Sequence, residues 1–201
     1  MERQKIKRRD SHLRRERIVQ AAVEFYFSEG YNVALEKIAD RALVGRATLY
    51  RFFPDRDALT AAVMQEVTED ITTQFRQWDD RDDGFFLCLK ALAVLTIASH
   101  GLQEMVALRQ KPDIREQSAR EFGAAIAAPL ARAKAAGLVR KDLTSRDALL
   151  IARMVAVGGM SEQSGNTDAG IDHALRMLMP ILAPGDAGQS RSAAMERAEQ
   201  L

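Results

Sequence analysis

The sequence predicts an all-α fold in which an N-terminal three-helix helix-turn-helix domain precedes a C-terminal helical bundle, with about nine helices in total. Apolar residues recur every three or four positions along nearly the whole chain, which is the period of an amphipathic helix. Glycine and proline fall between these runs, and no segment alternates as a half-buried strand does. With 201 residues, 47% of them apolar, the chain is long enough to bury a core.

The N-terminal part contains three predicted helices and the start of a fourth. The apolar period places helices at residues 11–29, 35–42 and 46–52, with a short break between the second and the third. Pro54 ends the third helix, and Asp55 is placed to cap a long fourth helix that reaches about residue 78. Two short helices joined by so tight a break form a helix-turn-helix pattern.

The helices that follow are predicted from the same period and from their caps. A helix at residues 85–108 is apolar over most of its circumference, which predicts a central position in the bundle. The next helix begins at Pro112, where Asp113 and Glu116 have the spacing of a capping box. Pro129 predicts a kink or a break before this helix ends near residue 136.

The chain ends with two more predicted helices and a tail. Thr144 and Asp147 repeat the capping spacing ahead of a helix that reaches residue 160, and the last helix covers residues 168–182. Gly, Ser, Ala and charged residues dominate residues 184–201, where we expect a flexible tail. The predicted organisation is a basic arm with the helix-turn-helix domain at residues 1–54, a larger helical domain at 55–183, and this tail.

Composition excludes several classes of protein. The single cysteine, Cys88, permits no internal disulfide and no multi-cysteine zinc site, and three histidines offer little for a metal site. We therefore expect no metal, no cofactor and no catalytic residues. The longest uncharged stretch, residues 91–103, is too short for a membrane-spanning helix, and the charged N-terminus has no apolar signal segment. These features predict a cytoplasmic protein without a membrane partner.

Charge is unevenly distributed along the chain. The formal net charge is +1, but residues 1–60 carry 13 basic and 9 acidic side chains, a net +4, and residues 61–201 carry a net −3. Residues 1–17 are the most basic part, with eight Lys or Arg against three Asp or Glu. Such an arm suits a polyanion such as DNA, and the alternative is a charged terminus that is only solvated.

The third predicted helix carries side chains suited to reading DNA. The second helix of a helix-turn-helix unit can enter the major groove with its N-terminal residues next to base edges. Arg46 can donate two hydrogen bonds to guanine, Thr48 can bond a base or contact a thymine methyl, and Tyr50 can reach a phosphate. The alternative is that these are two adjacent short helices of an all-helical protein without this role.

Two segments carry a resemblance to a known family: Ile38–Ala42, with the sequence IADRA, and Thr48–Leu59, with the sequence TLYRFFPDRDAL. They resemble the DNA-binding domain of the tetracycline-repressor (TetR) family of transcriptional regulators, and the similarity covers roughly residues 14–59. The resemblance implies DNA contacts by Thr48, Tyr50 and Arg56, the last of which stands at the family's usual phosphate-binding Lys. The predicted DNA-binding residues are Arg46, Thr48, Tyr50, Arg51 and Arg56.

Arg56 also has a physical argument of its own. It lies in the first turn of the predicted fourth helix, where the free backbone amides favour phosphate. The alternative is a surface ion pair with Asp55 or Asp57.

Several positions depart from the family's usual pattern. Leu43 stands where the turn usually has Gly, and a branched residue at positive φ costs on the order of 1 kcal/mol unless the turn is built differently. Ala34 and Gly45 replace the usual caps of the second and third helices, so each helix start lacks a side-chain bond. Phe52 replaces a His that often contacts phosphate.

The resemblance further implies a larger domain that dimerises through its last two helices and binds a small-molecule effector. Thr96, His100 and Gln103 lie on one face of the 85–108 helix, as polar groups of a pocket would. That face continues to Lys111, so the alternative is the solvent side of the helix. Phe122 and Met154 are candidate lining residues of an apolar cavity or members of the core.

Three further residues have two readings each. Gly158 and Gly159 allow close approach of helices, either at a subunit interface or inside the core. Cys88 lies among apolar residues, so it is a buried small hydrophobe or, alternatively, a thiol sensor.

These observations predict a ligand-responsive transcriptional regulator, a repressor, that binds a palindromic operator in double-stranded DNA as a homodimer. One alternative is a constitutive DNA-binding protein without an effector. Another is an all-helical enzyme, but the sequence offers no convergent acid, base and nucleophile, no phosphate loop and no metal-spaced cluster.

Overall fold

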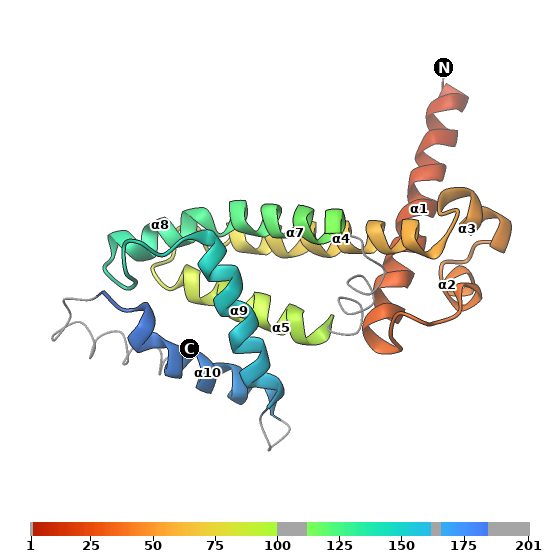
Figure 1. The fold of residues 1–201 in the computed structure, drawn as a ribbon. Helices are drawn as coiled ribbons and strands as arrows, with labels where there is room; N and C mark the ends of the chain where they lie inside the picture. Colours follow the sequence, from red (N-terminus) through yellow and green to blue (C-terminus); the bar gives the residue numbers. More distant parts are fainter. Residues whose placement is uncertain (1, 100–111, 162–165, 185–201) are drawn as a thin grey trace. The chain divides into compact units, whose positions relative to one another are not determined.

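The computed structural model describes residues 2–99, 112–161 and 166–184, and these residues are helical with no strand among them. Figure 1 shows the helices in chain order. They are α1 (Glu2–Ser28), α2 (Leu35–Arg41), α3 (Arg46–Phe52), α4 (Arg56–Arg76), α5 (Gly84–Ala98), α7 (Pro112–Ala125), α8 (Ala127–Ala135), α9 (Ser145–Met160) and α10 (Thr167–Leu182). The all-α prediction is therefore confirmed.

The chain folds as two compact units, and each has its own hydrophobic core. Among the described residues, 2–69, 99 and 112–118 form the N-terminal unit, and 70–98, 119–161 and 166–184 form the C-terminal unit. The N-terminal core is built from α1, α2, α3 and the first turns of α4, with Leu59 and Val63 fully buried in it. This core continues past Pro54 into α4, because that helix buries its first apolar turns in it.

The C-terminal core is centred on α5, as the apolar circumference of that helix predicts. Phe85, Cys88 and Leu89 of α5 are fully buried, and α5 contacts α8, α9 and α10. Phe75 of α4 stacks on Trp78 with 6.0 Å between ring centroids. This unit therefore has a single core shared by helices that are distant in sequence.

Caps fix the starts of three helices. The Oδ1 atom of Asp55 accepts a hydrogen bond from the Ala58 amide at 2.7 Å, so the predicted cap of α4 is confirmed. Thr144 and Asp147 form the predicted capping box of α9, in which each side chain bonds the backbone of the other residue. Asn166 caps α10 by accepting from the Ala169 amide.

Proline breaks one predicted helix into two. The run expected to reach residue 136 ends as α7 at Ala125 and resumes as α8 at Ala127. Pro129 explains the break, because it has no amide hydrogen to donate to the carbonyl of Ala125. The structure also corrects the expected start of α7: Asp113 lies inside the first turn of the helix and is not its N-cap.

Helix α1 begins earlier than expected, at Glu2 and not near residue 11. The basic arm is therefore a continuation of the helix, and Figure 1 shows its N-terminal turns extending past α2 and α3. Between Arg9 and Arg17 every residue is exposed except Ser11, which is half-buried, and Ile18 is the first buried residue of the described part of α1. The sequence pattern hid this extension because these turns bury no apolar stripe.

The paired glycines of α9 serve the core within one chain. A Cβ atom on Gly159 would lie 2.8 Å from Cγ1 of Ile171 and 3.0 Å from Cδ1 of Ile97. A Cβ atom on Gly158 would lie 2.6 Å from that of Ala174. The second of the two readings is therefore the correct one for this structure: the glycines allow α9 to pack closely on α10 and α5.

No helix in the described part of the chain is both long enough and apolar enough to cross a membrane.

Substituting Gly159→Ala should lower the free energy of unfolding by about 1–3 kcal/mol, because the added methyl overpacks the contact with Ile171. This cost exceeds the roughly 1 kcal/mol that Ala gains over Gly in a helix. Gly123→Ala in α7 is the matched control, since its nearest neighbour would be 3.8 Å away. Chemical denaturation of both variants measures the difference. A Gly159→Ala protein as stable as the control would contradict this packing.

Candidate nucleic-acid interface

The turn between α2 and α3 keeps a strained backbone. Leu43 has φ of +56°, the only positive φ of a non-glycine residue among the described residues. The Val44 amide donates to the carbonyl of Ala39 and the Leu43 amide to that of Asp40, both at 3.0 Å. The turn is therefore closed with Leu43 in the left-handed region. The Leu43 side chain is 80% exposed, so no burial offsets this strain.

Helix α3 is held by its inner face. Leu49 is fully buried, and Phe53 directly after the helix is 3% exposed. Gly45 caps α3 without a side-chain bond, as its residue type predicts. Two turns of helix are thus fixed by burial of one side and not by their termini.

The outer face of α3 brings together the polar residues that the sequence singles out. Arg46 is exposed and forms an ion pair with Glu36 of α2. Tyr50 is 43% exposed, and Thr48 is half-buried. The guanidinium of Arg51 lies over the ring of Phe52, 5.3 Å from its centroid. This reading face, defined as Arg46, Thr48, Tyr50 and Arg51, can donate several hydrogen bonds to bases and phosphates.

Arg56 is placed differently from the expectation. Its guanidinium donates to the backbone carbonyl of Tyr31 at 2.5 Å and to that of Val33 at 2.7 Å. It also lies over the Tyr31 ring, 5.3 Å from the centroid. No ion pair with Asp55 or Asp57 is among its contacts in the described structure. Sequence reasoning missed this arrangement because both acceptors belong to a loop more than 20 residues away.

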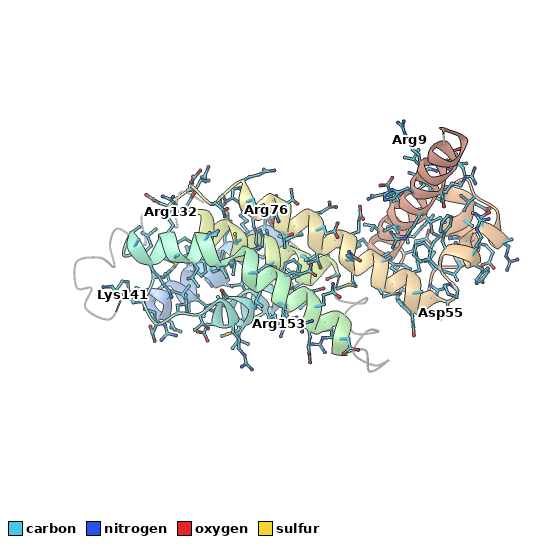
Figure 2. The ribbon with its side chains drawn as sticks, turned by 90° about the horizontal axis from the view of Figure 1, so that it is seen from above. Arg9, Asp55, Arg76, Arg132, Lys141 and Arg153 are labelled. Carbon is cyan, nitrogen blue, oxygen red and sulfur yellow. The ribbon has the colours of Figure 1, made fainter. Side chains whose placement is uncertain are left out.

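The basic side chains of α1 continue the cationic surface. Figure 2 shows Arg9 at the projecting end of this helix. Arg14, Arg15 and Arg17 are exposed one to two turns further on, and the Arg15 guanidinium lies over the ring of Phe53 at 5.3 Å. This contact joins the C-terminal part of the basic arm to Phe53, the residue that follows α3.

A groove of about 1020 Å³ separates α1 from the end of α2 and from Leu43. Its walls carry Arg14, Arg17 and Arg41, but also acidic Glu16 and Glu24. Arg41 is paired with Glu24 at 2.9 Å. The opposed charges make this groove a poor site for an anion.

Three of the predicted effector residues, Thr96, Phe122 and Met154, lie in the described part of the chain. Thr96 is half-buried and its hydroxyl donates to the Leu92 carbonyl at 2.7 Å. Phe122 packs on Phe75, with 6.5 Å between ring centroids. Met154 is 50% exposed, so it lies on the surface of α9 and not in an interior cavity. His100 and Gln103 lie outside the described residues.

The sequence does not predict a pair of buried hydroxyl groups that the structure contains. Thr68 of α4 and Ser118 of α7 are 1% and 8% exposed, and their oxygens lie 3.1 Å apart. The Thr68 hydroxyl also lies 2.7 Å from the Met64 carbonyl, to which it donates. A helical period cannot reveal such a pair, because small polar residues fit either face of a helix.

Cys88 has the environment of a core residue. Its side chain is fully buried, and burial together with the nearby charge of Asp79 raises the pKa of its thiol to about 12. The thiol therefore stays neutral and inaccessible near pH 7, which favours the hydrophobe reading over thiol sensing.

An exposed apolar surface covers the last two helices. On α9 it comprises Leu150, Met154, Val157 and Met160, and on α10 Met177 and Ile181. All six are between 46% and 66% exposed. We call this set the α9–α10 face. Apolar side chains in such number are typical of a protein interface.

Leu43→Gly should raise the free energy of unfolding by up to about 1 kcal/mol, because glycine adopts positive φ without strain. Leu43→Ala is the matched control: it removes the same exposed side chain but keeps a Cβ atom in the strained turn, so it should gain nothing. Thermal and chemical denaturation of the two variants test this. Equal stability of both would show that the turn stores no strain.

Comparisons with known proteins find similarity to transcriptional regulators. The sequence model described as "Bacterial regulatory proteins, tetR family" matches residues 18–63. An HTH-type transcriptional regulator of Staphylococcus aureus (strain bovine RF122 / ET3-1) is 35% identical over 74 residues, which are 36% of this chain and 40% of that regulator. The matched region thus spans well under half of the relative.

Solved structures extend the likeness to the fold of most of the chain. A TetR transcriptional regulator from Streptomyces coelicolor superposes with a TM-score of 0.67 at 25% identity, covering 85% of this chain and 99% of that one. A TetR transcription regulatory protein from Mycobacterium vanbaalenii gives 0.63 at 25% identity, covering 88% and 98%. The N-terminal segment is thus similar to the tetR family model, and most of the chain shares the fold of these two solved TetR regulators.

Proposed function

We propose that this protein is a transcriptional regulator that binds double-stranded DNA through α3. The observation that carries the proposal is the reading face: a row of cationic and polar side chains on a short helix whose opposite side is anchored by Leu49. The match of the family model over residues 18–63 supports the same assignment.

The reading face divides into two kinds of contact. Arg46 and Thr48 lie in the first turn of α3, where a recognition helix meets base edges. Tyr50 and Arg51 lie one turn further on, where side chains reach phosphates. Glu36 holds Arg46 in the free protein. Because a guanidinium has five donors, Arg46 can bond a guanine while it keeps part of this pair.

The helical arm of α1 adds a contact that does not depend on sequence. Its exposed arginines, from Arg9 to Arg17, are positioned to neutralise phosphates and so to release counterions. Operator affinity should therefore fall steeply with salt. The arm raises the affinity for any DNA, and the reading face provides the sequence specificity.

We propose that the active form is a homodimer joined through the α9–α10 face. A twofold interface pairs the same patch of both subunits. The α9–α10 face is apolar, so two copies of it can bury each other's side chains. Two recognition helices related by a twofold axis match a palindromic operator.

We propose further that the protein is a repressor released by a small-molecule effector bound in the C-terminal unit. The similarity of the N-terminal segment to the tetR family model supports this step. An effector can release DNA only if it binds one dimer geometry more tightly than the other. Phe122 and Thr96 are the described residues that stay candidates for its site, together with His100 and Gln103 outside the described ranges. Such a regulator acts in the cytoplasm.

Selection of DNA sites from a random pool with the full-length protein should enrich a palindrome. Against that site, Arg46→Ala and Tyr50→Ala should each weaken binding by roughly 5- to 100-fold, the range for loss of a base or phosphate contact. Arg76→Ala is the control, because Arg76 is exposed at the end of α4 in the C-terminal unit. Gel-shift titration measures all three. Enrichment of no site, or unchanged affinity of both reading-face variants, would contradict the proposal.

Val157→Glu should convert the dimer into a monomer, because it places a carboxylate in the middle of the α9–α10 face of each subunit. Val94→Glu is the matched control, since Val94 is 43% exposed on α5 and outside that face. Sedimentation velocity reads out the oligomeric state. A wild-type monomer, or a Val157→Glu dimer as tight as the control, would exclude this interface.

A further inference from the structure

The guanidinium of Arg56 is directed into its own domain. It donates to two backbone carbonyls, those of Tyr31 and Val33, at 2.5 and 2.7 Å, and it lies over the Tyr31 ring. Hydrogen bonds from a charged donor are about twice as strong as neutral ones, and the planar fork of arginine fixes both acceptors at once. The loop between α1 and α2 is thus attached to the first residue of α4.

Arg56 binds the backbone directly before the start of α2, an end that has no side-chain cap. The N-cap position of α2 is Ala34, which supplies no side-chain bond to the helix. Val33, whose carbonyl Arg56 holds, immediately precedes this cap. The Lys37 amide donates to the Ala34 carbonyl at 3.1 Å. The first turn of α2 therefore begins directly after Val33, whose carbonyl is bound by Arg56.

Further hydrogen bonds hold Arg56 and the first turn of α4 in place. The Thr60 hydroxyl donates to the Arg56 carbonyl at 2.8 Å, and Thr60 is 2% exposed. Asp55 caps the same turn. Tyr31 is 4% exposed, its ring packs on that of Tyr26 at 5.7 Å, and its hydroxyl donates to Asp57 at 3.4 Å. Loop and helix therefore meet through several partly buried contacts around one guanidinium.

Two contacts connect α2, whose start Arg56 holds, to α3. The closed turn at Leu43 and the ion pair between Arg46 and Glu36 connect the two helices. We propose that Arg56 is a positioning residue, which fixes the angle of the reading face relative to α4 by holding the Tyr31 and Val33 carbonyls, and that it is not a phosphate ligand. The inference rests on the proposed function for its effect on DNA, whereas the hold on the loop is a property of the free protein.

The first test uses amide hydrogen exchange on the full-length protein without DNA. Arg56→Lys keeps the charge but lacks the fork, and Arg56→Gln lacks both. Each variant should speed exchange at Val33 and Lys37 by roughly tenfold or more, which corresponds to losing a charge-assisted hydrogen bond. The Ala148 amide, bonded in the C-terminal unit, is the internal reference. Unchanged exchange at Val33 and Lys37 in both variants would overturn the proposal.

The second test separates positioning from phosphate binding and from a merely structural role. It measures affinity against salt, for the selected operator and for the operator with one base pair changed. A positioning role predicts that both variants lose roughly tenfold in selectivity between the two sites, with the salt slope unchanged. A phosphate ligand predicts a slope lower by about 0.9 for Arg56→Gln, no loss for Arg56→Lys and unchanged selectivity.

Two further results are informative. Lower stability with selectivity and slope both unchanged would show that Arg56 only supports the fold, and would overturn the proposal. Arg51→Gln, on the reading face, is the control that should lower the salt slope without altering exchange at Val33. A wild-type protein that binds no DNA would remove the proposed function, while the exchange experiment would still decide whether Arg56 holds the loop.

Discussion

Burial of one face of each helix holds α2 and α3 in place. Both α2 and α3 have seven residues, and helices of two turns are not stable alone in water. Each contributes fully buried side chains, Ile38 from α2 and Leu49 from α3, to a core that α1 and α4 complete. The orientation of the reading face is therefore set by this core, and a change in α1 or α4 affects it as directly as a change in α3.

Local chemistry works against these short helices at three points. Ala34 and Gly45 leave both N-termini without a side-chain cap, and Leu43 strains the turn between them. Each defect costs on the order of 1 kcal/mol or less. Tertiary contacts offset them: the core supplies most of the stabilisation, and Arg56 binds the segment that precedes the uncapped start of α2. Stability of this unit therefore depends on tertiary contacts and not on the ends of its short helices.

Local signals in the sequence predicted much of the fold. Asp55 and Thr144 cap the helices they were expected to cap, and Pro129 interrupts a helix. Features that depend on distant partners were not predictable. The two carbonyls that hold Arg56 lie on another loop, and a helical period cannot say whether Met154 faces a cavity or solvent. The arm of α1 was misjudged because a helix without an apolar stripe gives no periodic signal.

In the proposed homodimer, DNA binding by the reading face and association through the α9–α10 face would depend on each other energetically. A seven-residue helix offers only a few base contacts, so one subunit binds one half-site weakly. When two subunits are joined, the second contact becomes intramolecular and gains a high effective concentration. By linkage, operator binding must then strengthen dimerisation by the same free energy with which dimerisation strengthens operator binding. An effector that changed the geometry of the proposed dimer would act on this shared free energy.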